Sequence, residues 1–219
     1  AQESRGLGDV YKRQDLDAQP RLIHLQAAAV IAAPGYSAFP PQHVGEYGYG
    51  VLDHVMTSLE FECLLNSAPA GRLLRPTDGR KIQKIAFISC VGSRDSRRGR
   101  PYCSSVCCAI TAKQAAAARE RDQRIESCVF YMDLRSGGEA SGLYLERQTR
   151  APGVRYERCQ VSTIKQRQKS RNLLIGYQDA AGRPREEEFD LVVLAVGLGG
   201  PSAAQAALAS GLGIEVDVH

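Results

Sequence analysis

The chain has 219 residues, 43% of them hydrophobic, with a formal net charge of +4. This length suffices for one large domain or two small ones, the mild charge gives no indication of a nucleic acid partner, and no apolar run approaches the ~20 residues of a membrane span. Seven cysteines, odd in number and clustered, argue against a secreted disulfide framework and favour a reducing, cytoplasmic setting.

The first residues are a separate segment. The eleven residues from Ser4 to Gln14 resemble the translation of a sequencing adapter used in library preparation. We therefore assign residues 1–14 to a non-native tail outside the fold; the alternative is a natural basic tail. Because the chain stops just after the strand-like run 214–216, we expect it to be an internal fragment of a longer protein.

Strands and helices are predicted to alternate along the rest of the chain. The apolar run Ala27–Ala33 stops at a Pro-Gly pair and predicts a short buried strand. Thr57 or Ser58 can cap a helix that follows, and Ser104 or Ser105 can cap another to about Arg121. A third helix is expected over 142–150, and further strands over 84–90, 127–133, 154–161, 173–178, 187–189 and 190–197. This order predicts an α/β fold with a mainly parallel sheet.

Two predicted strands resemble each other, since both 30–35 and 192–197 end in Ala-x-Gly. They bracket residues 39–189, as expected if a second domain is inserted into a first. Glycine at a strand end lets the backbone approach a ligand closely, which makes Gly35 and Gly197 candidate cofactor contacts. The alternative is two ordinary buried strands that end in turn glycines.

The most informative motif is C-x12-C-x3-C-C, which lies between an apolar strand and an alanine-rich helix. It comprises Cys90, Cys103, Cys107 and Cys108. Thiolates are soft ligands for iron–sulfur clusters and zinc, and a [4Fe–4S] cluster needs four of them. Cys103 and Cys107 would share a face of a helical turn, whereas Cys108 requires a cluster at the mouth of the helix. The helix N-terminus favours an anionic cluster, as would the nearby arginines Arg94, Arg97, Arg98 and Arg100.

Other interpretations of the motif remain open at this point. Zinc sites usually have two short knuckles, and only the Cys103–Cys107 pair fits one. A redox pair would have to use the adjacent Cys107 and Cys108, because C-x-x-C is absent, and buried structural cysteines are the simplest alternative. The three other cysteines are predicted core residues, one in a helix and two in strands: Cys63, Cys128 and Cys159. A lone Gly92 disfavours nicotinamide binding, and Asp133 is expected to pair with Arg135 or face water.

The chain resembles the A subunit of heterodisulfide reductase and its relatives in electron-bifurcating and quinone-linked complexes. The matching segments are residues 46–50, 56–61, 75–79, 84–95, 101–108, 130–135 and 189–198. Together they cover nearly everything after the adapter-like start, and the cysteine motif is the most specific of them.

The resemblance implies a thioredoxin-reductase-like nucleotide-binding fold with an inserted domain. Residues 15–38 and 190–219 would belong to a truncated FAD-binding domain, and residues 39–189 to an inserted α/β domain with the cysteine motif. The four cysteines would ligate one [4Fe–4S] cluster and have no acid–base role. The family's Ala-Thr-Gly near the flavin reads Ala33-Pro34-Gly35 here, and the flavin-phosphate motif would lie before residue 1.

The implied function is electron transfer between FAD and the cluster, with flavin-based bifurcation toward ferredoxin and a disulfide acceptor. The implied partners are other heterodisulfide-reductase-type subunits and a ferredoxin or hydrogenase-type electron donor or acceptor. The alternative from another functional class is a zinc-stabilised binding module without a redox role.

Overall fold

The computed structural model describes residues 19–69, 72–199 and 202–215, so the predicted tail 1–14 lies outside the described residues. The chain divides into two compact units, residues 1–34 and 35–219. In the first unit, residues 19–34 are exposed and form no helix or strand. The predicted buried strand Ala27–Ala33 is therefore wrong. A strand is held by a hydrogen-bonded neighbour, and no strand in the described part of the chain pairs with this run.

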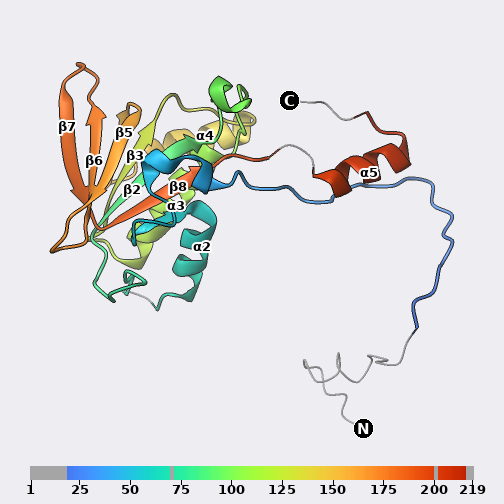
Figure 1. Cartoon of the computed structure of the whole chain (residues 1–219), viewed down its shortest axis with the longest axis horizontal. Helices are drawn as coiled ribbons and strands as arrows, with labels where there is room; N and C mark the ends of the chain where they lie inside the picture. Colours follow the sequence, from blue (N-terminus) through green and yellow to red (C-terminus); the bar gives the residue numbers. More distant parts are fainter. Residues whose placement is uncertain (1–18, 70–71, 200–201, 216–219) are drawn as a thin grey trace, which may run out of the picture. The chain divides into compact units, whose positions relative to one another are not determined.

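The second unit contains all the described helices and strands (Figure 1). The strands are β1 (Val55–Thr57), β2 (Lys84–Val91), β3 (Glu126–Tyr131), β4 (Val154–Arg158), β5 (Val161–Gln166), β6 (Leu173–Gln178), β7 (Pro184–Phe189) and β8 (Leu191–Val196). The helices are α2 (Ser58–Ser67), α3 (Cys107–Arg121), α4 (Glu139–Thr149) and α5 (Ala203–Leu212), with 3-10 turns η1 (Pro41–His43), η2 (Gly45–Tyr47) and η3 (Ser96–Arg98). A parallel sheet of order β1-β8-β2-β3-β4 accompanies an antiparallel sheet of order β5-β6-β7. The predicted α/β class with a mainly parallel sheet is confirmed.

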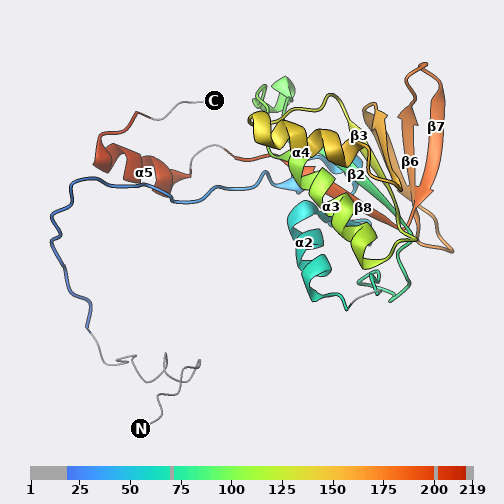
Figure 2. The same cartoon turned by 180° about the vertical axis from the view of Figure 1, so that it is seen from behind.

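The parallel sheet lies between two layers, and alternate residues of its central strand β2 face each of them. Ile85 and Phe87 pack with Phe61 of α2 and with the alanines of α3 on one face. Ile88 packs on the other face, with Phe189 and the rest of the antiparallel sheet. α4 lies beside α3, and Figures 1 and 2 show the helical layer from both sides. Both faces of the parallel sheet are therefore buried, as its uninterrupted apolar strands require.

Some element boundaries differ from the predicted ones. The predicted strand 154–161 is two strands, β4 and β5, which belong to different sheets and are separated by Cys159 and Gln160. α4 begins three residues before the predicted start, at Glu139. The start of α2 is confirmed in detail, because Thr57 forms a capping box with Glu60.

The chain enters and leaves the parallel sheet region at one place. Ala38 and Leu198 form an isolated antiparallel bridge. The Phe39 N–H donates to the Gly197 carbonyl at 2.8 Å, and the Gly199 N–H donates to the Ser37 carbonyl at 2.5 Å. The segments on either side of residues 39–197 are thus hydrogen-bonded to each other.

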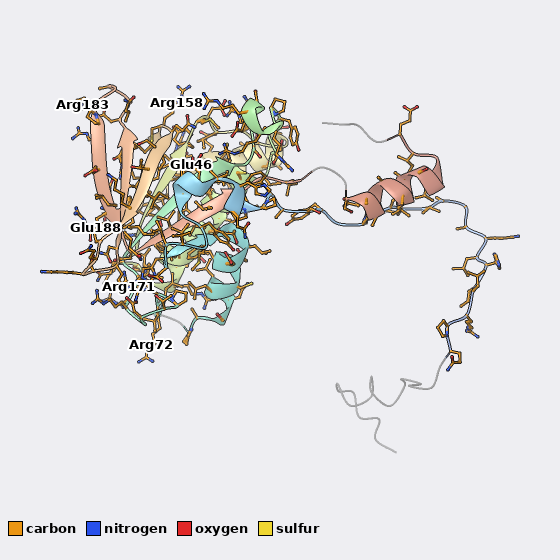
Figure 3. The ribbon with its side chains drawn as sticks, in the orientation of Figure 1. Glu46, Arg72, Arg158, Arg171, Arg183 and Glu188 are labelled. Atoms are coloured by element: carbon orange, nitrogen blue, oxygen red, sulfur yellow. The ribbon has the colours of Figure 1, made fainter. Side chains whose placement is uncertain are left out.

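Basic side chains project from the sheets and the loops (Figure 3). Several of them are paired with acids, such as Arg171 with Asp53 and Arg183 with Asp179. Among the described residues, no helix is long and apolar enough to cross a membrane.

Candidate metal centre

The cysteine motif occupies the loop that joins β2 to α3, and this loop is conformationally strained. Cys90, Arg94 and Ser105 have φ values of 62°, 58° and 57°, in the left-handed region that non-glycine residues avoid. Only one other described non-glycine residue, Arg171, has a positive φ. Such strain persists only where surrounding contacts enforce it, and it concentrates at functional sites.

The loop brings the four thiols to the carboxyl ends of the central parallel strands. Cys90 lies near the end of β2, Cys103 in the loop, and Cys107 and Cys108 are the first two residues of α3. The Cys107 thiol lies 4.0 Å from the carbonyl of Val196 at the end of β8. The Cys108 thiol lies 3.8 Å from the carbonyl of Asp133, just beyond β3. Three neighbouring strands therefore end around one group of thiols.

Backbone amides donate hydrogen bonds to the sulfurs. The Ser105 N–H donates to Cys103 Sγ at 3.3 Å, and the Arg135 N–H donates to Cys108 Sγ at 3.5 Å. These donors would stabilise thiolates more than thiols, and hydrogen bonds to sulfur are one of the means by which proteins tune iron–sulfur clusters.

The thiols also influence one another electrostatically. Burial raises the pKa of Cys107 to about 12, a backbone hydrogen bond from Cys90 opposes this, and the other three thiols of the motif raise it further. Burial likewise raises the pKa of Cys90 to about 11, with contributions from Cys108 and Cys103. The four side chains therefore share one electrostatic environment, and metal binding must release their protons.

Within the described residues, no group of three or more His, Cys, Asp or Glu side chains is arranged to hold a metal ion. The thiols of Cys107 and Cys108 instead approach backbone carbonyls, as protonated thiols do. The donor set nevertheless fits a four-thiolate cluster in number, in softness and in the backbone N–H groups that reach the sulfurs.

The helix does not begin where the sequence predicts. Val106 is its N-cap and makes no side-chain cap bond, so Cys103 precedes the helix and does not share a helical face with Cys107. The reason is that Ser104 is committed elsewhere: its hydroxyl hydrogen-bonds Ser93 Oγ at 2.6 Å and accepts from the Leu198 N–H at 2.9 Å. Cys107 and Cys108 therefore lie at the mouth of the helix, where its dipole favours anions.

Acidic groups pair with some of the loop arginines. Arg94 pairs with Asp133, which also pairs with Arg135 as predicted. Arg98 bridges Asp95 and Glu46. Much of the positive charge expected to face the thiols is therefore compensated.

The two other loop arginines have different surroundings. Arg100 donates to the Leu198 carbonyl at 3.1 Å and lies over the Phe39 ring. The guanidinium of Arg97 has no carboxylate partner among the described residues, and it lines a cavity beside the site.

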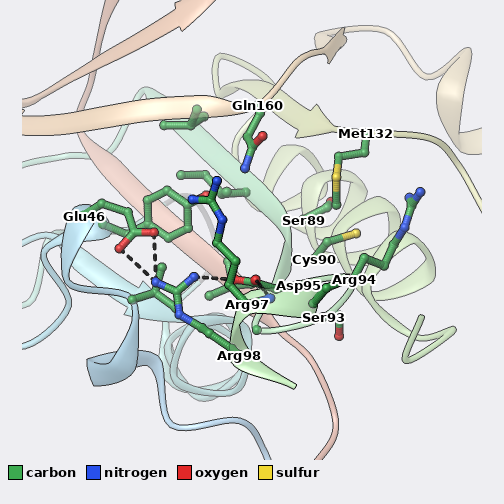
Figure 4. Close-up of a pocket in the computed structure, with 17 residues that line it drawn as sticks. Glu46, Ser89, Cys90, Ser93, Arg94, Asp95, Arg97, Arg98, Met132 and Gln160 are labelled. Atoms are coloured by element: carbon green, nitrogen blue, oxygen red, sulfur yellow. Dashed lines mark hydrogen bonds and ion pairs between the residues drawn. The ribbon is translucent and has the colours of Figure 1, made fainter. Parts of the chain in front are cut away.

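This cavity, of about 430 Å³, opens beside Cys90 (Figure 4). Its walls come from η2, from the loop after β2 and from the segments that follow β3 and β4, with Arg97 and Gln160 at its sides. The cavity therefore leaves one side of the thiol group open to small molecules or to another protein.

The two predicted flavin-contact glycines differ in their surroundings. A Cβ at Gly197 would lie 2.0 Å from Ser93 Oγ and 2.8 Å from Ser104 Oγ, so the close packing of the cysteine loop requires a glycine there. A Cβ at Gly35 would meet nothing within 4 Å, and its carbonyl accepts a hydrogen bond from Gln205. The described residues form no flavin cradle around either glycine, and both contacts stay predictions.

The three remaining cysteines are not all core residues. Cys128 is buried in β3, as predicted. Cys159 is half-buried one residue beyond β4, so its predicted place in a strand is wrong. Cys63 is exposed on α2, and its predicted place in the core is wrong because the buried face of that helix carries Phe61 and Leu65.

This difference predicts unequal effects on stability. Changing Cys128 to Ala should lower the free energy of unfolding by about 1 kcal/mol, because it leaves a small cavity. Changing the exposed Cys63 to Ala should leave it unchanged. Denaturant unfolding of the two variants measures this, and equal losses would contradict the assignment. Neither change should alter the iron content.

Comparison with known proteins relates the chain to reductase subunits. No model of a protein family matches it. The second iron–sulfur A subunit of CoB–CoM heterodisulfide reductase from Methanopyrus kandleri is 41% identical over 187 residues, 84% of this chain and 28% of the relative. The iron–sulfur A subunit from Methanocaldococcus jannaschii is 38% identical over 91% of this chain and 31% of the relative. The A subunit of the H2:CoB–CoM heterodisulfide,ferredoxin reductase of Methanothermobacter marburgensis is 35% identical over 86% of this chain and 29% of the relative.

The relatives are thus subunits of heterodisulfide reductases, and two of these three are named as iron–sulfur subunits. The chain belongs to the family of heterodisulfide reductase A subunits. It spans about 28–31% of the length of these relatives.

Among solved structures, the chain is similar to Lactococcus lactis thioredoxin reductase, with 17% identity over 77% of this chain and 43% of that one and a TM-score of 0.43. It is also similar to the FAD-bound cadaverine monooxygenase DfoA of Erwinia amylovora, with 10% identity over 81% of this chain and 45% of that one and a TM-score of 0.46. At these scores the likeness assigns no ligand to the chain.

Proposed function

We propose that this chain is part of an iron–sulfur flavoprotein oxidoreductase of the heterodisulfide reductase type. In this proposal one [4Fe–4S] cluster is held by the thiolates of Cys90, Cys103, Cys107 and Cys108. The observation that carries it is the gathering of these four thiols at the ends of β2, β3 and β8, at the mouth of α3. When bound, such a cluster supplies one-electron transfer.

The chain's own groups would serve the cluster in three ways. The four thiols lose their protons and bind iron, the amides of Ser105 and Arg135 donate to sulfur, and the buried strand ends limit the access of water. The exposed part of the loop, residues 96–99, leaves one side of the site open to an electron partner.

The domain layout is also a proposal. Residues 39–189 would form an inserted domain, and residues 15–38 and 190–219 part of an FAD-binding domain. The bridge between Ala38 and Leu198 supports this, because an inserted domain needs its entry and exit side by side. In the whole protein, electrons would pass between FAD and the cluster, with bifurcation toward ferredoxin and a disulfide acceptor. The relatives' names support ferredoxin and further reductase subunits as partners.

Anaerobic reconstitution tests the proposal. The purified 219-residue chain, supplied with iron and sulfide, should take up about four irons and four sulfides, turn brown and show an EPR signal on reduction. Stoichiometric zinc without sulfide would overturn it and support a zinc-stabilised binding module. Colour separates the two outcomes at once, because zinc–thiolate sites are colourless.

A further inference from the structure

Two of the four thiols are connected through a chain of contacts that the cysteine spacing does not reveal. Cys90 and Arg94 belong to β2 and the loop after it, and Asp133 and Arg135 to the segment after the neighbouring strand β3. The guanidinium of Arg94 pairs with the carboxylate of Asp133. This ion pair joins the ends of two adjacent strands.

Each end of the ion pair reaches a thiol. On one side, Arg94 hydrogen-bonds Cys90 and opposes the effect of burial, which raises the pKa of that thiol. On the other side, the backbone around Asp133 surrounds Cys108. The thiol approaches the Asp133 carbonyl at 3.8 Å and accepts from the Arg135 N–H at 3.5 Å. Cys90 and Cys108 are thus linked through residues outside the cysteine motif.

The conformation of Arg94 is enforced by the fold. Its φ of 58° is unfavourable for a side-chain-bearing residue, and its N–H is held by the Tyr102 carbonyl at 2.9 Å. This backbone carries the guanidinium to both Cys90 and Asp133. Arg135 completes the arrangement, because its side chain holds the second carboxylate oxygen of Asp133 at 3.2 Å.

Stability of the fold does not explain the pair. The side chains of Arg94 and Asp133 are 21% and 37% exposed, and ion pairs with that much solvent access contribute little to the free energy of unfolding. Its effect must therefore be local, on the thiols that it connects.

We propose that Arg94 and Asp133 are positioning residues that brace Cys90 against Cys108 in the four-thiolate site. The proposal rests on the proposed function and adds residues outside the cysteine motif to it. Outer contacts of this kind commonly change metal affinity by about 10-fold to 100-fold when removed.

Three variants of the 219-residue chain test the brace: Arg94→Gln, Asp133→Asn and, as a matched control, Arg97→Gln. The control removes the same charge from the same loop, but the Arg97 guanidinium contacts neither a thiol nor a carboxylate among the described residues. Each reconstituted chain is examined for iron content, rate of cluster loss to an iron chelator, EPR spectrum and midpoint potential. Thermal unfolding of the cluster-free chains tests the fold.

The brace predicts that Arg94→Gln and Asp133→Asn both accelerate cluster loss, on the order of 10-fold, and both alter the EPR spectrum. Arg97→Gln should retain the wild-type rate and spectrum, and all three cluster-free chains should unfold at the wild-type temperature.

The two brace variants change the local charge in opposite directions, so a simple field effect would shift their potentials oppositely without changing the rate of loss. That result would overturn the proposal, as would an equal acceleration in Arg97→Gln. A wild-type chain that binds no cluster would instead refute the proposed function, and the brace with it.

Discussion

Replacing Cys107 with Ala should abolish the cluster. Cys107 is 4% exposed, lies first in α3 and is influenced electrostatically by the other three thiols of the motif. Without its thiolate one iron has no protein ligand, and alanine offers no substitute donor. The reconstituted variant should retain few of the four irons and little absorbance near 400 nm.

The matched control for this experiment is Cys63→Ala, which removes an exposed thiol from α2. It should reconstitute like the wild type. The Cys107 variant leaves a small cavity that costs about 1 kcal/mol, so circular dichroism must show that it is folded before its iron content is interpreted. Four irons in a folded Cys107 variant would exclude this residue from the ligand set. A Cys108→Ala variant that kept its cluster would show that the adjacent cysteine is not a ligand.

The parallel sheet can be predicted from sequence because its strands are buried on both faces. β2 and β8 are uninterrupted apolar runs, and such runs carry their own signal without any neighbour. The run Ala27–Ala33 is just as apolar, yet no strand in the described part of the chain lies beside it. Composition indicates a tendency to form a strand, whereas pairing depends on a partner that a local pattern does not reveal.

Element ends are harder to predict where side chains serve distant contacts. Ser104 has the residue type of a helix cap, but its hydroxyl holds Ser93 and Leu198. Similarly, the alternation in 154–161 continues across Cys159 and Gln160, although the chain passes from one sheet to the other there. Both cases depend on contacts far apart in sequence.

The candidate site is predictable as a set of ligands but not in its surroundings. Four clustered cysteines are visible in the sequence. The approach of Asp133 and Arg135 to Cys108, from 25 and 27 residues along the chain, depends on β3 lying next to β2. The usable signal is the position of Asp133 shortly after a strand, because the carboxyl ends of adjacent parallel strands meet at one edge.

Gly92 should be the most sensitive glycine of the cysteine loop. Its φ is +72°, and a Cβ there would lie 2.1 Å from Cδ1 of Phe39, a core side chain only 3% exposed. Gly92→Ala combines a left-handed backbone with overpacking, which together should lower the free energy of unfolding by about 2–5 kcal/mol.

Gly99 in the same loop is the matched control, with a φ of +68° and nothing within 4 Å of its Cβ position. Gly99→Ala bears the backbone cost alone, about 1–2 kcal/mol. Denaturant unfolding of both cluster-free variants measures the difference, which isolates the contact with Phe39. If the two alanines were equally destabilising, the Phe39 ring would not be packed against Gly92. A larger loss in Gly92→Ala would show that the turn after Cys90 is held in place by the core residue at the chain's entry into the sheet region.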